Sequence, residues 1–165
     1  MLKRTTYLFI SLVIFASSKS QVNLVPNYSF ESTIGSCSIQ MGIISNSQNW
    51  YPAKESPDYY NTCANSFIYP EASTIPNNCR GYQQAKSGIA FSGIGLYYLT
   101  NSSDSINISS ELMGVKLKQP LKPNTCYYGE FYISLSEASD IAINRIGMLF
   151  TQNTYTLNYQ NFDNF

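Results

Sequence analysis

The feature that most constrains the fold is an alternation of apolar and polar residues with a period of two. The alternation is clearest in the segment CYYGEFYISL, residues 126–135. There Phe131, Ile133 and Leu135 fall on one face, opposite the more polar residues between them. Successive side chains of a β-strand point to opposite faces of a sheet, so this pattern predicts a half-buried strand. No apolar stripe with the period of a helix is long enough to compete, and the sequence therefore predicts an all-β protein.

Three other segments also read as strands, and they are VKLKQPL (residues 115–121), AINRIGMLFT (residues 142–151) and GIAFSGIGLYYL (residues 88–99). The first alternates until Pro120 limits its ladder, the second could start with a turn of helix, and the third reads as a strand pair. Short strands separated by polar turns are typical of a β-sandwich or a β-barrel.

Polar connections lie between these predicted strands. Residues 37–80 contain repeated prolines and only modest strand signals, so we expect a long functional or covalently pinned loop. TNSSDSINISS, residues 100–110, reads as a solvent-facing loop. The sequence has glycosylation sequons at Asn27, Asn101 and Asn107, which matter only if the host glycosylates.

The beginning of the chain has the organisation of a secretory signal peptide. Two basic residues precede a short apolar run, residues 7–16, and small residues then offer cleavage after Ser18 or Ser20. The run is too short for a bilayer core, which needs about 20 apolar residues. We therefore expect residues 1–20 to be removed, residues 21–165 to form one secreted or surface-exposed domain, and no membrane span to remain.

The cysteines agree with export. Cys37, Cys63, Cys79 and Cys126 are widely spaced and form no C-x-x-C pair of a zinc ribbon or a thioredoxin-like motif. Two structural disulfides are the natural interpretation in an oxidising compartment. Four cysteines allow three pairings, and the sequence alone does not choose among them. As a working hypothesis we pair Cys37 with Cys63 and Cys79 with Cys126.

Charge and histidine content exclude several classes of function. The chain has 10 basic and 10 acidic residues and no histidine. Loss of the three basic residues in the signal peptide would leave a net charge of −3, so nucleic acid is a poor partner. Without histidine, a Ser-His-Asp triad, a Cys-His dyad and a His-ligated metal site are impossible. A glycosidase needs two carboxyl groups that face each other, and the scattered acidic residues show no sign of such a pair. We therefore expect that the protein is not an enzyme.

The opening NLVPNYSFES, residues 23–32, resembles the first strand of galactose-binding-like jelly-roll modules, which include carbohydrate-binding modules and begin N-L-[VI]-x-N-G-x-F-E. Later segments resemble a subgroup found at the N-terminus of exported surface proteins of gliding-type bacteria, some with an OmpA-like domain downstream. The matching segments are Trp50 with SPDYYNTC, GYQQAKSGIAFSG, KQPLKPNTCYYGEFYISLSEAS and AINRIG, in that order. The resemblance covers residues 23–150 and implies a jelly-roll β-sandwich that binds a carbohydrate without catalysis.

The chain also departs from this pattern. Tyr28 follows Asn27 where the pattern has glycine, and Cys79 is not part of the pattern. The sequence ends at YQNFDNF without the acidic strand that commonly closes such jelly rolls. The resemblance therefore implies a truncated module that lacks about a quarter to a third of the usual jelly-roll length. An unpaired strand edge would then be exposed.

The segment SPDYYNTC, residues 56–63, allows a structural, a glycan-binding and a protein-binding interpretation. In the first, its tyrosines pack the loop against the sandwich. In the second they join a glycan platform, because aromatic faces stack on sugar C–H surfaces while amides bond hydroxyl groups. The residues of this expected aromatic platform are Trp50, Tyr51, Tyr59, Tyr60, Asn61, Tyr82 and Gln83.

The resemblance also nominates Glu31 as a ligand of a structural calcium ion, with backbone carbonyls nearby, since calcium prefers oxygen ligands. A solvated or hydrogen-bonded Glu31 is the alternative. We expect no other cofactor. The predicted partner is a carbohydrate or another cell-envelope component. The alternative function is that of a structural or adhesive module, which docks a downstream envelope domain or a protein partner.

Overall fold

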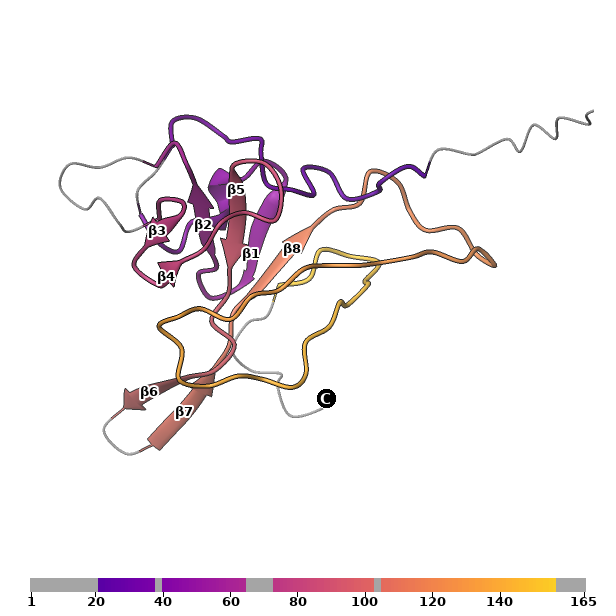
Figure 1. Ribbon diagram of the computed structural model, residues 1–165. Coiled ribbons are helices and arrows are strands. Elements are labelled where there is room, and N and C mark those ends of the chain that lie inside the picture. The colour runs from indigo at the N-terminus through magenta and orange to yellow at the C-terminus, as the bar shows by residue number, and fades with distance from the viewer. Residues whose placement is uncertain (1–20, 38–39, 65–72, 103–104, 157–165) are drawn as a thin grey trace, which may run out of the picture.

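The computed structural model describes residues 21–37, 40–64, 73–102 and 105–156 (Figure 1). Within these residues the chain forms β-strands and a single short 3-10 helix, in agreement with the predicted all-β class. The predicted signal peptide, residues 1–20, lies outside the described residues.

The elements in chain order are η1 (Ile44–Asn46), β1 (Trp50–Lys54), β2 (Asp58–Asn61), β3 (Asn77–Asn78), β4 (Gly81–Tyr82), β5 (Ala90–Gly93), β6 (Tyr98–Ser102), β7 (Ser105–Ser109) and β8 (Leu112–Val115). Every strand has one antiparallel partner among the described residues: β1 pairs with β8, β2 with β5, β3 with β4, and β6 with β7. These are two-stranded sheets, and they do not by themselves establish the predicted jelly-roll sandwich.

A small core lies where η1, β2 and β5 meet. Ile44, Tyr59 and Ala90 are buried there, and Phe30, Trp50 and Met113 pack against them as partly buried side chains. The other face of β2 is also covered, because the Tyr60 ring stacks on its cross-strand partner Phe91 with ring centroids 4.7 Å apart. Aromatic cross-strand pairs of this kind stabilise two-stranded antiparallel sheets.

The C-terminal half differs most from the sequence prediction. β8 ends at Val115, and the extended arm, which we define as residues 116–150, forms no ladder with another described residue. The predicted strands at residues 126–135 and 142–151 are extended chain, and residues 126–135 make no backbone hydrogen bond to another described residue. Figure 1 shows the arm as a long orange and yellow excursion beyond β8. A strand needs a hydrogen-bonded neighbour, which a period-two pattern does not specify.

Two further segments correct the sequence prediction. The expected pair within residues 88–99 contains β5 and the start of β6, but these strands pair with β2 and β7 instead of with each other. The expected loop at residues 100–110 is largely the hairpin of β6 and β7. Isoleucines alternate with polar residues over Ser105–Ser109, a strand signal that its serine and asparagine content concealed.

Candidate functional site

Asp58 begins β2 and fixes the loop that precedes it. Its Oδ1 atom accepts a hydrogen bond from the Gly42 N–H at 2.6 Å, and its Oδ2 atom accepts one from the Tyr60 hydroxyl at 3.2 Å. Burial raises the pKa of Asp58, and the hydrogen bond from Gly42 opposes that shift. This carboxyl group therefore serves the local structure of the SPDYYNTC segment.

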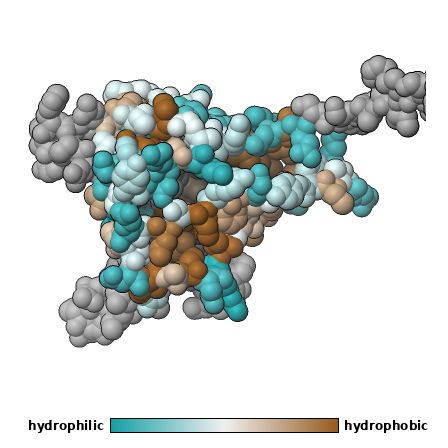
Figure 2. Space-filling model, in the orientation of Figure 1, coloured by the Kyte–Doolittle hydropathy of each residue, from teal (hydrophilic) through white to brown (hydrophobic). Residues whose placement is uncertain are grey.

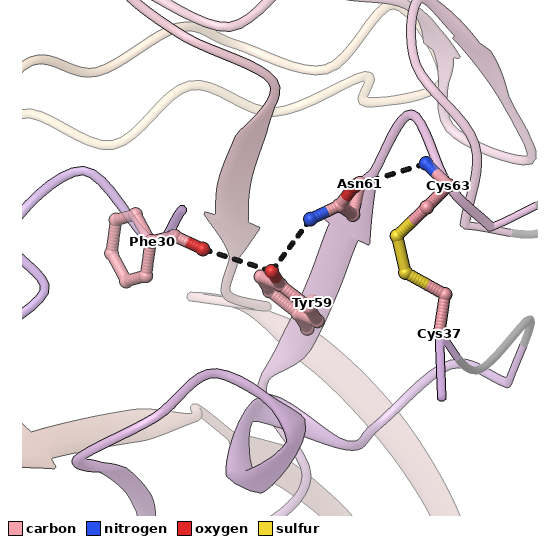
Figure 3. The surroundings of a disulfide bond; sticks show 5 residues. All are labelled: Phe30, Cys37, Tyr59, Asn61 and Cys63. Carbon is pink, nitrogen blue, oxygen red and sulfur yellow. Dashed lines mark hydrogen bonds between the residues drawn. A yellow bond between two sulfur atoms is a disulfide. The ribbon is translucent and has the colours of Figure 1, made fainter. Parts of the chain in front are cut away.

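A chain of hydrogen bonds runs through β2 from the N-terminal turn to a disulfide (Figure 3). The Tyr59 hydroxyl donates to the Phe30 carbonyl at 2.8 Å and accepts from Asn61 Nδ2 at 2.7 Å. Asn61 Oδ1 then accepts from the Cys63 N–H at 3.0 Å. Cys63 is bonded to Cys37, as the first half of the working hypothesis predicts. One polar network thus links three separate segments of the chain.

Burial excludes the β2 residues from a ligand-binding surface. Tyr59, Tyr60 and Asn61 are 3%, 2% and 1% exposed. Burial also raises the pKa of both tyrosines, so they remain protonated donors. These three residues of the expected aromatic platform therefore lie in the interior of the described structure. Their rings and amide already have protein partners on both faces of the strand, which supports the structural interpretation of SPDYYNTC.

Trp50 closes the core and anchors the N-terminal turn. Its Nε1 atom donates to the Asn27 carbonyl at 2.9 Å, and its ring lies 4.7 Å from the Phe30 ring. The Asn27 side chain completes this turn through hydrogen bonds to the Ser32 and Gln48 backbones and to the Ser47 hydroxyl. The sequon at Asn27 therefore carries a fully engaged amide. Trp50, also expected in the platform, packs its ring against Phe30 and uses its N–H group in a hydrogen bond within the protein.

Tyr51 of the expected platform and Tyr28, the departure from the resembled sequence pattern, lie in different environments. Tyr51 is half-buried in β1, and its ring lies across Gly114, its cross-strand partner in β8. Tyr28 is 62% exposed, so the side chain that replaces the glycine of the family pattern extends into solvent at that turn.

Tyr82 and Gln83 lie apart from the core, beside the extended arm. Tyr82 is 52% exposed, and its hydroxyl accepts a hydrogen bond from Gln84 Nε2 at 2.8 Å. From the arm, Tyr132 is 65% exposed, and Lys86 Nζ lies 4.5 Å from its ring centroid. We call this region the Tyr82 surface, and it consists of Arg80, Tyr82, Gln83, Gln84, Lys86 and Tyr132.

Hydrogen bonds hold the arm against β4 at this surface. Glu137 Oε2 accepts from the Tyr82 N–H at 2.8 Å. The Arg80 carbonyl accepts from the Ser136 hydroxyl at 2.7 Å and from the Ala138 N–H at 3.2 Å. These bonds bring two exposed tyrosines from distant parts of the sequence to neighbouring segments, with amide and cationic side chains beside them.

Glu31 has only part of the environment expected of a calcium ligand. Its Oε2 atom accepts from the Ile89 N–H at 2.9 Å, whereas its buried Oε1 atom has no hydrogen-bond partner among the described residues. That orphaned oxygen suits one cation contact. The described residues contain no group of three or more acidic or cysteine side chains that could hold a metal ion, and the nearby Phe30 carbonyl already accepts from Tyr59.

The second expected disulfide is not formed. Cys79 and Cys126 are free, exposed thiols. Cys79 lies between β3 and β4, where its sulfur contacts that of Met41 at 3.6 Å, and Cys126 lies on the extended arm. The second half of the working hypothesis, the pairing of Cys79 with Cys126, is therefore wrong.

Sequence reasoning did not identify the contact between Lys86 and Tyr132 or the hydrogen bonds of Glu111. Both oxygens of Glu111 are engaged, because Oε2 accepts from the Gly95 N–H at 2.6 Å and Oε1 lies 3.5 Å from the Ser56 hydroxyl. Burial raises the pKa of this carboxyl group. The alternation around residues 126–135 marked Tyr132 as a surface residue, but no local signal pointed to its contact with Lys86.

Comparisons with known proteins give no further assignment. No protein-family model matches the chain, and neither the curated proteins nor the solved structures contain a match. Within the described part of the chain, no helix is long and apolar enough to cross a membrane.

Proposed function

We propose that this chain is a non-catalytic binding module of an exported protein and that its ligand is a carbohydrate bound at the Tyr82 surface. The main observation in support is that Tyr82 and Tyr132 both expose their rings and lie on two segments joined by hydrogen bonds. Exposed tyrosine rings supply apolar contact area at low entropic cost, and sugar C–H faces match them. Gln83 and Gln84 add amide groups for hydroxyl recognition.

Two observations support a binding role over catalysis. The whole sequence lacks histidine, which removes the commonest general acid and base. The two carboxyl groups with raised pKa values, Asp58 and Glu111, both accept short hydrogen bonds from backbone N–H groups. Export is supported by the signal-like N-terminus and by the Cys37–Cys63 disulfide, which fits a non-cytoplasmic protein.

The proposal is tested with a glycan array followed by calorimetry on the full chain. Tyr82→Ala and Tyr132→Ala should each weaken binding to the best array ligand about tenfold, the size of one lost stacking contact of about 1.4 kcal/mol. Tyr28→Ala is the matched control, because Tyr28 is equally exposed but lies at the N-terminal turn. Absence of binding to every glycan by the folded protein would overturn the proposal, and so would equal losses in all three variants.

A second candidate function rests on the arm. Large apolar side chains are exposed along it, and they include Phe131, Ile133 and Leu135 on one face of residues 126–135. In Figure 2 apolar side chains reach the surface in the lower half of the view, where Figure 1 shows the extended segment. An extended chain with free backbone groups is suited to strand addition by a protein partner. The module would then be structural or adhesive and would dock an envelope domain.

This alternative has its own test. Substitution of Ile133 and Leu135 by lysine should abolish attachment of the protein to cell envelopes and leave glycan affinity unchanged. The control substitution, Ser134→Lys, adds charge on the opposite face of the same segment. If the double substitution leaves attachment intact, the docking function is rejected.

We also propose a structural calcium ion at Glu31, on the strength of its orphaned Oε1 atom. Glu31 would supply the carboxylate, and the ion would stabilise the junction between the N-terminal turn and the residues before β5. Added calcium should raise the melting temperature, chelation should reverse the gain, and Glu31→Gln should remove the response. An unchanged melting temperature in saturating calcium would eliminate the site.

A further inference from the structure

The Tyr82 surface carries two basic side chains, and one of them has no carboxylate partner among the described residues. Lys86 and Arg80 are both exposed. Lys86 Nζ contacts the face of the Tyr132 ring at 4.5 Å and pairs with no carboxylate of the described residues. Since the mature chain is expected to be net negative, a cation at this position is not explained by a generally basic protein.

Two acidic groups that interact with this surface, Glu137 and Asp58, already accept hydrogen bonds from the protein. Glu137 directs Oε2 to the Tyr82 N–H, where it holds the arm. Asp58 lies beneath and receives hydrogen bonds from Gly42 and Tyr60, and Arg80 is close enough to lower its pKa slightly against the larger effect of burial. Part of the charge of Arg80 therefore faces Asp58. Lys86 is the cation that remains available to a ligand.

From this arrangement we infer that the ligand is an acidic polysaccharide, whose carboxylate pairs with Lys86 while its sugar rings stack on Tyr82 and on the face of Tyr132 that Lys86 does not cover. The inference rests on the proposed function and specifies its ligand class. A cation beside an exposed aromatic ring matches a uronic acid, in which one residue combines an apolar ring face with a negative charge. A neutral glycan would use the rings and leave Lys86 without a partner.

The test compares two polymers with the same sugar backbone, polygalacturonate and its fully methyl-esterified form, by calorimetry on the full chain. Esterification removes the negative charge and keeps the ring faces. We expect binding to polygalacturonate at least fivefold tighter than to the ester, and a difference that shrinks as salt is added. Lys86→Gln should weaken binding to polygalacturonate about fivefold and leave any binding to the ester unchanged.

Lys122→Gln is the matched control, because Lys122 is also exposed and lies beside the turn of the arm instead of at the Tyr82 surface. Equal binding of the acid and the ester would overturn this inference and leave the carbohydrate function standing. Equal losses in Lys86→Gln and Lys122→Gln would also overturn it, since they would indicate only diffuse charge attraction. Absence of binding to both polymers overturns the inference, and the glycan array described above then decides whether the carbohydrate function is lost as well.

Discussion

Removal of the Tyr59 hydroxyl is the sharpest perturbation of the β2 network. Tyr59→Phe keeps the ring and its packing but deletes one donor and one acceptor. The Asn61 amide, in a side chain that is 1% exposed, loses its partner at 2.7 Å, and the Phe30 carbonyl loses its donor at 2.8 Å. A buried polar group left unsatisfied costs about 1–3 kcal/mol. Because the amide is fully buried and the carbonyl only partly, we expect a loss of about 2–3 kcal/mol in the free energy of unfolding.

Urea unfolding followed by the fluorescence of the single tryptophan measures this loss, since Trp50 packs against the same turn as the network. Tyr82→Phe is the control, because its hydroxyl is solvent-exposed and water replaces the lost bond; we expect a change below about 0.5 kcal/mol. Asn61→Ala should be costly alone, and Tyr59→Phe with Asn61→Ala should cost less than the sum. Equal stabilities of Tyr59→Phe and Tyr82→Phe, at unchanged urea dependence, would refute the reasoning.

Three other predictions concern the sheets, the disulfide and the loop before β2. Gly114→Ala should destabilise the protein by about 1–3 kcal/mol in urea, because the new Cβ would lie 2.8 Å from a ring atom of the tyrosine across the strand pair. Gly147→Ala, with nothing within 4 Å, should be neutral, and the reverse order would contradict the register. Replacement of Cys37 and Cys63 by serine should cost about 3.5 kcal/mol relative to the oxidised parent protein, from the chain-entropy description of a 26-residue separation. Reduction of the parent protein should cost the same amount, and a much smaller loss in both cases would contradict this prediction. Asp58 has a folded pKa above its ordinary 3.8, so its contribution to stability is greatest below that value and is lost as pH rises through the folded pKa. The urea midpoint of the parent protein should therefore fall as pH rises through the folded pKa of Asp58, and Asp58→Asn should make this fall smaller. An identical pH profile of the urea midpoint in the parent protein and in Asp58→Asn would exclude a contribution of Asp58.

An alternating sequence pattern predicts the facing of side chains but not the strand to which a segment pairs. Alternation at residues 126–135 predicts which side chains would share a face of a strand, but Phe131, Tyr132 and Ile133 are all exposed in the structure. It carries no information on which chain supplies the hydrogen-bonding neighbour, so the predicted ladder is missing there. The shorter segment Ser105–Ser109 has the same alternation and does form a strand, because β6 lies next to it in sequence and a hairpin is local.

The sequence pattern also does not specify which side chains of the candidate site are covered by neighbouring segments. Tyr59 and Tyr60 could be assigned to a loop of special importance from the sequence, but residue type does not distinguish a core tyrosine from a ligand-binding one. The distinction follows from tertiary contacts, because the Phe91 ring of β5 packs on Tyr60 and the N-terminal turn contacts Tyr59 on the other face of β2. The partners of Tyr82 were beyond prediction for the same reason, since the arm that carries Tyr132 is joined to β4 and Arg80 by hydrogen bonds between residues far apart in the sequence.

The β2 network around Tyr59 and the Tyr82 surface are separate, so substitutions in them should affect stability and ligand binding independently. Tyr59 belongs to a network that joins the N-terminal turn, β2 and the disulfide, whereas Tyr132 lies on a segment without a backbone ladder to the described residues. Residues that share no partners have additive effects. A core substitution such as Tyr59→Phe should therefore lower the unfolding free energy without changing ligand affinity. Tyr132→Ala should do the reverse, because a half-solvated ring on an unpaired segment contributes little to folding but half of the proposed stacking surface.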